Sequence, residues 1–136
     1  MQVYLDTSAL LKLIVKEPES SALETYLGGF QSDTRFTAAL ARAELVRAVA
    51  RRESTASVEH ARRVLGRLDL VPLTNRLLDA AAAMTPQALR TLDAIHLAAA
   101  MTAPDLRAVV TYDRRLADAA AAHGIPAVNP GVSTTG

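Results

Sequence analysis

The sequence predicts an α/β fold in which a parallel sheet is flanked by helices, and two observations lead to this expectation. Short apolar runs rich in β-branched residues, typical of buried strands, alternate along the chain with segments whose apolar residues recur at helical spacing. Half of the 136 residues are hydrophobic, which is enough for one packed core. We therefore expect one domain over residues 1–129 and a flexible tail over residues 130–136.

The first strand is expected at residues 3–5, and Asp6 ends it. A helix then begins beside Ala9, with Thr7 or Ser8 as its cap. Pro18 breaks this helix, and a second helix is expected at 19–27, stopped by Gly28 and Gly29. A strand at 35–37 follows, then helices at 40–52 and 57–68 separated by a turn near Ser54 and Thr55, and a strand at 70–73. The last elements are expected to be a helix from Thr74 or Asn75 to Met84, a helix at 92–101, a strand at 108–111, a helix at 114–123 closed by Gly124, and a short strand at 127–128.

Composition excludes several classes of protein. The chain has no cysteine, which excludes disulfides and thiolate metal sites and is compatible with a reducing cytoplasm. It has neither a secretory signal pattern nor an uninterrupted apolar stretch of about 18 residues, so we expect a cytoplasmic protein with no membrane partner. No glycine-rich phosphate loop with a lysine is present, which argues against a P-loop nucleotidase.

Charge is nearly balanced overall, at a net +1, but is unevenly distributed. Seven arginines and only three acids lie between Arg42 and Arg67. This basic pair of helices could attract phosphates or an acidic partner, or it could be a solvated surface. Aromatic residues are scarce, which argues against base stacking on an aromatic platform.

Four acidic residues stand where α/β folds place functional groups. Asp6 and Asp113 each follow a predicted strand and precede a helix, so both are expected at the carboxyl edge of the sheet, where such folds bind ligands. Asp93 lies in the first turn of an alanine-rich helix that looks buried, where a lone charge is costly. Glu44 lies early in the 40–52 helix. Each alone could be a cap, a turn residue or a solvated side chain, but together they indicate a cluster.

A cluster of carboxylates indicates a hard divalent cation, because carboxylates that converge on one cleft repel each other. Mg²⁺ and Mn²⁺ prefer oxygen ligands, and such an ion can polarise a phosphodiester and activate water. No Ser–His, Cys–His or paired-histidine arrangement offers another catalytic route. The residues therefore predict metal-dependent hydrolysis of a phosphoryl–oxygen bond.

Four segments, in order, resemble the motifs of the PIN-domain family and, more narrowly, those of VapC toxins from bacterial toxin–antitoxin pairs. The segments are residues 3–10 (VYLDTSAL), 43–45 (AEL), 92–98 (LDAIHLA) and 110–116 (VTYDRRL). Each is short, but the ordered set covers nearly the whole chain. The resemblance implies a Rossmann-like three-layer sandwich with about five parallel strands. It also implies an Mg²⁺- or Mn²⁺-dependent endoribonuclease that cuts structured RNA such as tRNA or ribosomal RNA and is held inactive by a VapB-type antitoxin. Separately, alanine and leucine stripes on several predicted helices leave room for a homodimer, or they could equally belong to the core.

The same resemblance assigns roles to individual residues. Four acids match the catalytic pocket, and the first two of them match metal ligands: Asp6, Asp93, Glu44 and Asp113. Thr7 and Ser8 match hydroxyl residues that can position water or the scissile phosphate. Four arginines could contact RNA or a partner protein, or could be helix-surface charges: Arg47, Arg51, Arg114 and Arg115. His96 is expected to be a hydrogen-bonded core residue, although its position three residues after Asp93 could bring it near the cleft, and Asp118 is expected to face solvent.

Two other functions compete with this hypothesis. A phosphatase of the haloacid-dehalogenase type also begins with a strand that ends in aspartate, but it needs a second acid two residues later, where this chain has Ser8. A non-catalytic PIN-like module that binds RNA or a protein is the alternative from another class. The presence of all four matching acids favours the enzyme.

Overall fold

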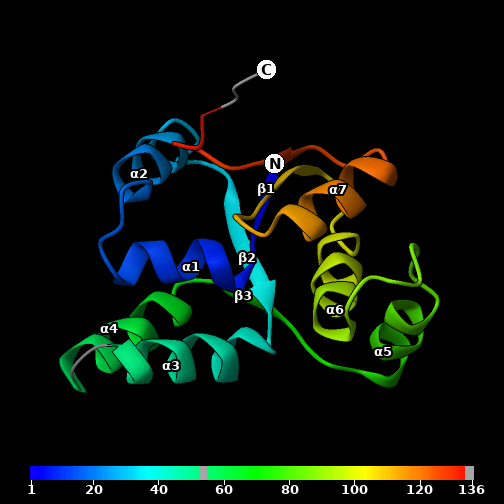
Figure 1. The fold of residues 1–136 in the computed structure, drawn as a ribbon, viewed down its shortest axis with the longest axis horizontal. Helices are drawn as coiled ribbons and strands as arrows, with labels where there is room; N and C mark the ends of the chain where they lie inside the picture. The colour runs from blue at the N-terminus through cyan, green and yellow to red at the C-terminus, as the bar shows by residue number, and fades with distance from the viewer. Residues whose placement is uncertain (53–54, 134–136) are drawn as a thin grey trace.

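The first strand, β1 (Gln2–Leu5), is the central strand of a five-stranded sheet. It pairs in parallel with β2 (Thr34–Ala38) on one side and with β4 (Leu106–Val110) on the other. The edges are β3 (Asp69–Val71), beside β2, and β5 (Ala127–Val128), beside β4, and both pair in parallel. The structure, a computed structural model, describes residues 1–52 and 55–133, and Figure 1 shows its strands at the centre. The predicted parallel α/β sheet is confirmed.

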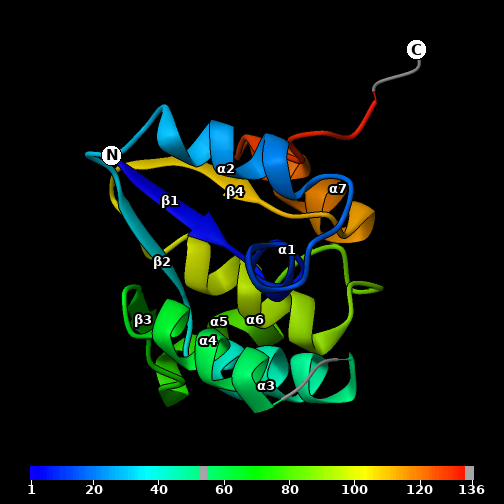
Figure 2. The same ribbon diagram turned by 90° about the vertical axis from the view of Figure 1, so that its left-hand side faces the viewer.

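Seven helices in the described residues cover this sheet: α1 (Thr7–Ile14), α2 (Ser20–Gly28), α3 (Ala41–Arg52), α4 (Thr55–Leu65), α5 (Asn75–Ala82), α6 (Thr91–Ala100) and α7 (Arg114–Ala122). Figure 1 shows α1 to α4 on one side of the strands and α5 to α7 on the other, so the molecule has three layers. Figure 2 shows β1, β2 and β4 running in the same direction. Within the described ranges, every helix is too short or too polar to span a membrane.

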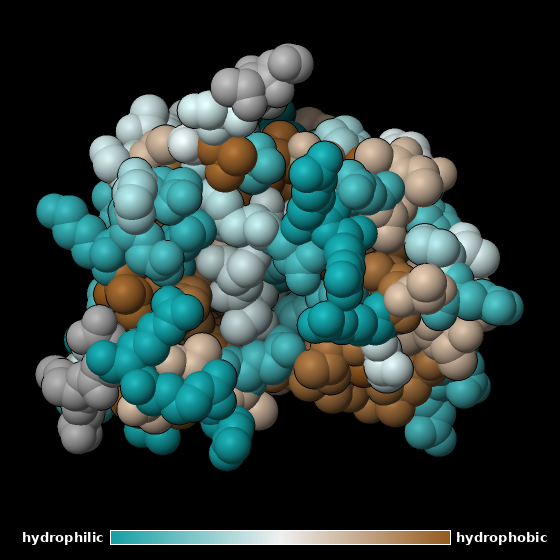
Figure 3. All heavy atoms as spheres, in the orientation of Figure 1, coloured by the Kyte–Doolittle hydropathy of each residue, from teal (hydrophilic) through white to brown (hydrophobic). Residues whose placement is uncertain are grey.

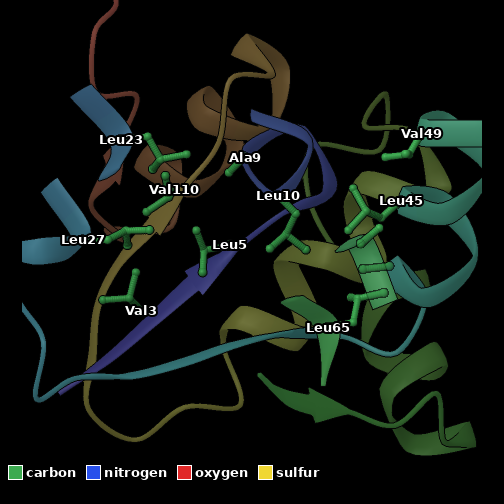
Figure 4. Packing of buried hydrophobic residues seen from close by; sticks show 12 residues of the cluster. Val3, Leu5, Ala9, Leu10, Leu23, Leu27, Leu45, Val49, Leu65 and Val110 are labelled. Atoms are coloured by element: carbon green, nitrogen blue, oxygen red, sulfur yellow. The ribbon is translucent and has the colours of Figure 1, made fainter. Parts of the chain in front are cut away.

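The alternation of side chains along β1 divides the core between the two faces of the sheet. Val3 and Leu5 pack against α1 to α4 in a cluster that Figure 4 shows, together with leucines such as Leu10 and Leu45. Tyr4 points to the opposite face, where it packs with β2, β4, α5 and α6. A further cluster joins α6 to α7. Both faces of the central strand are therefore buried, as expected for a parallel sheet.

Two helix ends show the predicted punctuation clearly. Thr74 caps α5 by accepting the N–H of Leu77, and Gly124 follows α7 with a φ of 73°, a conformation that suits glycine. The predicted cap of α1 by Thr7 or Ser8 is wrong. Asp6 is the cap, because its backbone is extended and its carboxylate accepts the N–H of Ala9.

Two predicted boundaries fall at the margins of the described chain. The turn near Ser54 and Thr55 involves residues 53–54, which lie outside the described residues, and α4 begins at Thr55. The predicted tail is described only to residue 133. Its first residue is held in place, because the hydroxyl of Tyr112 donates a hydrogen bond to the carbonyl of Pro130 at 2.7 Å.

Candidate active site at the carboxyl edge of the sheet

Three neighbouring strands deliver polar residues to the same edge of the sheet. Asp6 directly follows β1, and Thr111 directly follows β4, whose last residue Val110 pairs with Leu5. The chain that leaves β2 enters α3, and Glu44 lies in the first turn of that helix. Asp93 comes from the first turn of α6. The edge that the sequence predicted for a functional site therefore receives acids from segments far apart in the chain.

The carboxylate of Asp6 is buried, with only 4% of the residue exposed, and accepts three hydrogen bonds. Its Oδ1 accepts from the Ser8 hydroxyl at 2.6 Å and from the Ala9 N–H at 2.9 Å. Its Oδ2 accepts from the Thr111 hydroxyl. Burial raises the pKa of the Asp6 carboxyl, and these hydrogen bonds offset only part of that increase.

Ser8 and Thr111 connect Asp6 to the loop that follows β4. The hydroxyl of Ser8 accepts the backbone N–H of Tyr112 at 2.8 Å, and that of Thr111 accepts the backbone N–H of Asp113 at 3.0 Å. Both hydroxyl protons are therefore donated to Asp6. Thr111 was not among the predicted site residues; the available signal was a hydroxyl residue directly after a strand adjacent to β1.

Glu44 is held by hydrogen bonds to a single oxygen, Oε1. The Thr7 hydroxyl donates to this atom at 2.7 Å, and Nε2 of His96 lies 2.7 Å from it. Burial acts to raise the pKa of Glu44, but the hydrogen bonds with His96 and Thr7 outweigh burial and lower the pKa. Glu44 is therefore ionised at neutral pH, and its carboxylate accepts the hydroxyl proton of Thr7 in a hydrogen bond.

Asp93 and Asp113 contribute further negative charge. Burial raises the pKa of Asp93, and the charges of Asp113 and Asp6 raise it further, so these carboxylates lie close enough to repel one another. Asp113 also has the capping role that its sequence position allowed. Its Oδ1 accepts the N–H groups of Arg115 and Leu116 at 2.9 and 3.3 Å, at the start of α7.

The chemistry of these donors fits a hard divalent cation. The acidic side chains at this edge offer carboxylate oxygens as ligands, and a positive charge would relieve the repulsion between them. Within the described residues, no group of three acids, histidines or cysteines is close enough together to hold an ion by side chains alone. Mg²⁺ in proteins usually binds through one or two carboxylates and keeps several waters, so a cage of three side chains is not required. Asp6 and Asp93 are the side chains that would hold such an ion.

The remaining predicted residues lie on α3, α6 and α7. The four predicted arginines are exposed, two on α3 and two on α7: Arg47, Arg51, Arg114 and Arg115. Asp118 is exposed, as expected, and lines a cavity of about 480 Å³ together with Asp113 and Arg114. His96 is buried and hydrogen bonded, as expected, but its partners include the candidate site acid Glu44.

Solved structures with low sequence identity share this fold. The crystal structure of VapBC2 from Rickettsia felis, bound to a DNA fragment from its promoter, superposes with a TM-score of 0.72 at 15% identity, covering 96% of this chain and 99% of that one. The sarcin–ricin loop cleaving toxin VapC20 of Mycobacterium tuberculosis gives a TM-score of 0.73 at 16% identity, covering 94% of this chain and 99% of that one.

Sequence comparison is more specific. Residues 3–122 match the family described as the PIN domain. "Ribonuclease VapC47" of Mycobacterium tuberculosis is 43% identical over 132 residues, which cover 95% of this chain and 97% of that protein. "Ribonuclease VapC46" of the same species is 46% identical over 129 residues, which cover 94% and 97%. With these matches spanning nearly its whole length, the chain belongs to the PIN-domain family and, within it, to the VapC ribonucleases.

Proposed function

We propose that this protein is an Mg²⁺- or Mn²⁺-dependent endoribonuclease and the toxin of a toxin–antitoxin pair in the cytoplasm. The observation that carries the proposal is the convergence of Asp6, Glu44, Asp93 and Asp113 on one edge of the sheet, in a chain 43% identical to a named ribonuclease. Carboxylates that repel each other across a site cost stability, and binding of a cation would compensate that cost.

The side chains divide the catalytic tasks. Asp6 is immobilised by three hydrogen bonds, so it offers a fixed oxygen ligand, and Asp93 offers a second one. Glu44 is ionised, so it can accept a hydrogen bond or a proton from the attacking water. When bound, the metal ion would polarise the phosphodiester and lower the pKa of water. We expect hydrolysis by water to leave a 5′ phosphate on one product.

RNA would approach across basic surfaces on both sides of this edge. Arg47 and Arg51 are exposed on α3, and Arg114 and Arg115 are exposed at the start of α7, beside Asp113. One guanidinium group can donate two parallel hydrogen bonds to the oxygens of a phosphate, which suits a nucleic-acid backbone. The same arginines would pair with carboxylates of a VapB-type antitoxin. The sarcin–ricin loop, cut by VapC20, and tRNA are the substrates to test first.

An exposed apolar surface supports the expected homodimer. Leu78 and Leu92 have 39% and 49% of their surface exposed, and Leu78 lines a cavity of about 500 Å³ between α5 and α6. Figure 3 shows hydrophobic side chains gathered low on the right, over the region of these two helices. Exposed apolar patches of this kind mark protein contacts.

The test is cleavage of a sarcin–ricin loop RNA and of tRNA by purified protein with Mg²⁺, with Mn²⁺ and with EDTA. We expect cleavage only with a metal, and Asp93→Asn should reduce the rate by about 100-fold or more, as loss of one group that stabilises the transition state does. Asp79→Asn, an exposed acid on α5, is the matched control and should cleave normally. Sequencing of both RNA ends should find 5′ phosphates.

Several outcomes would contradict the proposal. Cleavage that continues in EDTA would exclude the metal, and 2′,3′-cyclic phosphate ends would exclude attack by water. A non-catalytic binding module would retain RNA or partner affinity and cut nothing with any metal.

A further inference from the structure

His96 is the buried link between the core and the candidate catalytic acid Glu44. Only 3% of the residue is exposed, and both ring nitrogens have partners. Nδ1 lies 2.6 Å from the hydroxyl oxygen of Tyr4, and Nε2 lies 2.7 Å from Oε1 of Glu44. Tyr4 is fully buried in β1, the central strand. A chain of hydrogen bonds therefore runs from the middle of the sheet to the acidic edge.

For a neutral His96 ring, one arrangement of protons satisfies both of its contacts. The backbone N–H of Ala38 donates to the Tyr4 oxygen at 3.2 Å, so the hydroxyl proton of Tyr4 is free to point to Nδ1 of His96. Because Nδ1 is then an acceptor, the neutral ring carries its proton on Nε2. That proton is donated to Glu44, whose carboxylate can only accept.

These contacts also distinguish the two oxygens of Glu44. Oε1 takes both hydrogen bonds, from Thr7 and from His96. In the described part of the chain, Oε2 takes none. A glutamate side chain has several rotatable bonds, and two donors on Oε1 anchor that oxygen and so limit the orientations of the carboxylate. Oε2 is thus the oxygen offered to water, substrate or a cation.

We propose that His96 is a positioning residue for catalysis, which, with its tautomer fixed by Tyr4, holds Oε1 of Glu44 so that Oε2 faces the reaction. This inference rests on the proposed function, because it assigns Glu44 a part in RNA cleavage. Partners that orient a site carboxylate in this way are worth about 10- to 100-fold in activity or metal affinity. A merely structural histidine would need only some acceptor for each nitrogen, and its loss would act through stability.

The decisive comparison is between two amide substitutions of His96. Gln places its amide near the position of Nε2 and can still donate to Glu44, whereas Asn reaches only the position of Nδ1 and can contact Tyr4 alone. With RNA as substrate, we expect His96→Asn to lower kcat by about 10- to 100-fold with KM nearly unchanged, and His96→Gln to restore most of that loss. His123→Asn, a change of the histidine beside Thr85, is the matched control and should keep full activity. Equal loss in both His96 variants would overturn the proposal.

A double-mutant cycle tests whether His96 acts through Glu44. In a Glu44→Ala background, His96→Asn should cost no further activity, because the carboxylate it positions is gone. An undiminished loss in that background would show that His96 acts through folding or by another route. Thermal unfolding of each variant sets the assay temperature well below every Tm, so that unfolded protein does not contribute to the comparison.

A measurement on the metal-free protein separates this inference from the proposed function. Nitrogen-15 correlation spectra of His96 should show the proton on Nε2 in the wild type, and Tyr4→Phe should weaken that preference. A proton on Nδ1 in the wild type would overturn the inference. If the spectra show Nε2–H while the wild type cuts no RNA with any metal, the proposed function fails, and with it the role of His96 in catalysis. If the wild type cuts RNA but the Asn and Gln variants are equal, only the inference fails.

Discussion

Asp6 combines two opposing demands at a single residue. Its carboxylate is buried at the end of the central strand, which is costly for a charged group, and burial raises its pKa. Three hydrogen bonds recover part of that cost. An acid retained under these conditions is typical of a functional site, where stability is given up for chemistry.

Asp6→Asn should therefore stabilise the metal-free protein at neutral pH. The folded pKa lies above the usual value of 3.8, so the folded state binds more protons between the two values and the free energy of unfolding falls as pH rises through that window. Asn has no charge to bury, and we expect a gain of about 0.5–2 kcal/mol at pH 7, the usual range for stabilising substitutions. Denaturant unfolding across pH should show the gain shrinking as pH falls toward 4.

The control for this prediction is Asp79→Asn on the exposed face of α5, which should change stability by less than about 0.5 kcal/mol at any pH. An Asp6→Asn protein less stable than wild type at pH 7 would count against this account of Asp6. So would a difference that does not vary with pH.

The acids of the site were predictable from sequence, but their partners were not. Asp6 and Asp113 follow strands, and helix spacing places Asp93 in a first turn, so each position could be inferred from local pattern. The hydroxyl of Thr111 donates a hydrogen bond to Asp6, 105 residues away in the sequence. This contact depends on the strand register that pairs Leu5 with Val110. Strand register is a tertiary property, so a single sequence does not specify it.

At the scale of elements, α6 is the helix on which the site depends most. It carries both Asp93 and His96, and every residue from Ala94 to Ala100 is buried. Its neighbours α5, α7 and β2 hold it in place. The alanine-rich sequence with few charges predicted this burial, because a helix apolar on most sides has no solvent face.

A pair of leucines on this helix tests how far packing fixes it. Leu97 is fully buried between α6 and α7, whereas Leu92 is 49% exposed. Leu97→Ala should lower the free energy of unfolding by about 2–5 kcal/mol, the range for buried large-to-small changes. In the monomer, where Leu92 is exposed, Leu92→Ala should cost less than about 0.5 kcal/mol. Equal costs, measured by denaturant unfolding, would mean that the packing of α6 on α7 does not hold the helix.

Element types were predicted more securely than element ends. All five strands and seven helices of the described chain lie where apolar pattern placed them. The helix expected to reach residue 68 ends at Leu65, and a turn at Gly66 and Arg67 follows. The cap of α1 was misassigned because Asp6, Thr7 and Ser8 can all cap a helix. The choice among them depends on contacts with Thr111 and Tyr112, which follow β4 far along the chain.

At the scale of the molecule, α3 carries exposed positive charge as well as the site acid Glu44. Exposed Arg47 and Arg51 should bind RNA phosphates without reading sequence. Changing either to Ala should weaken RNA binding and reduce the slope of log affinity against log salt by about 1. Arg76→Ala, an exposed arginine on α5, is the matched control and should leave the slope unchanged. Titration by fluorescence anisotropy, on an Asp93→Asn background to prevent cleavage, measures both, and unchanged slopes would remove α3 from the RNA surface.

The neighbouring positions of β1 and β4 have a consequence for how this protein is synthesised. Asp6 leaves the ribosome early, but Thr111 and Asp113 are translated about 100 residues later. A chain that stops before Leu106 lacks β4, which pairs with β1. It also lacks Thr111, so the carboxylate of Asp6 does not receive the hydrogen bond from that hydroxyl. Truncated translation products are thus expected to cut no RNA, and the activity proposed above would begin only when the final quarter of the polypeptide has been made.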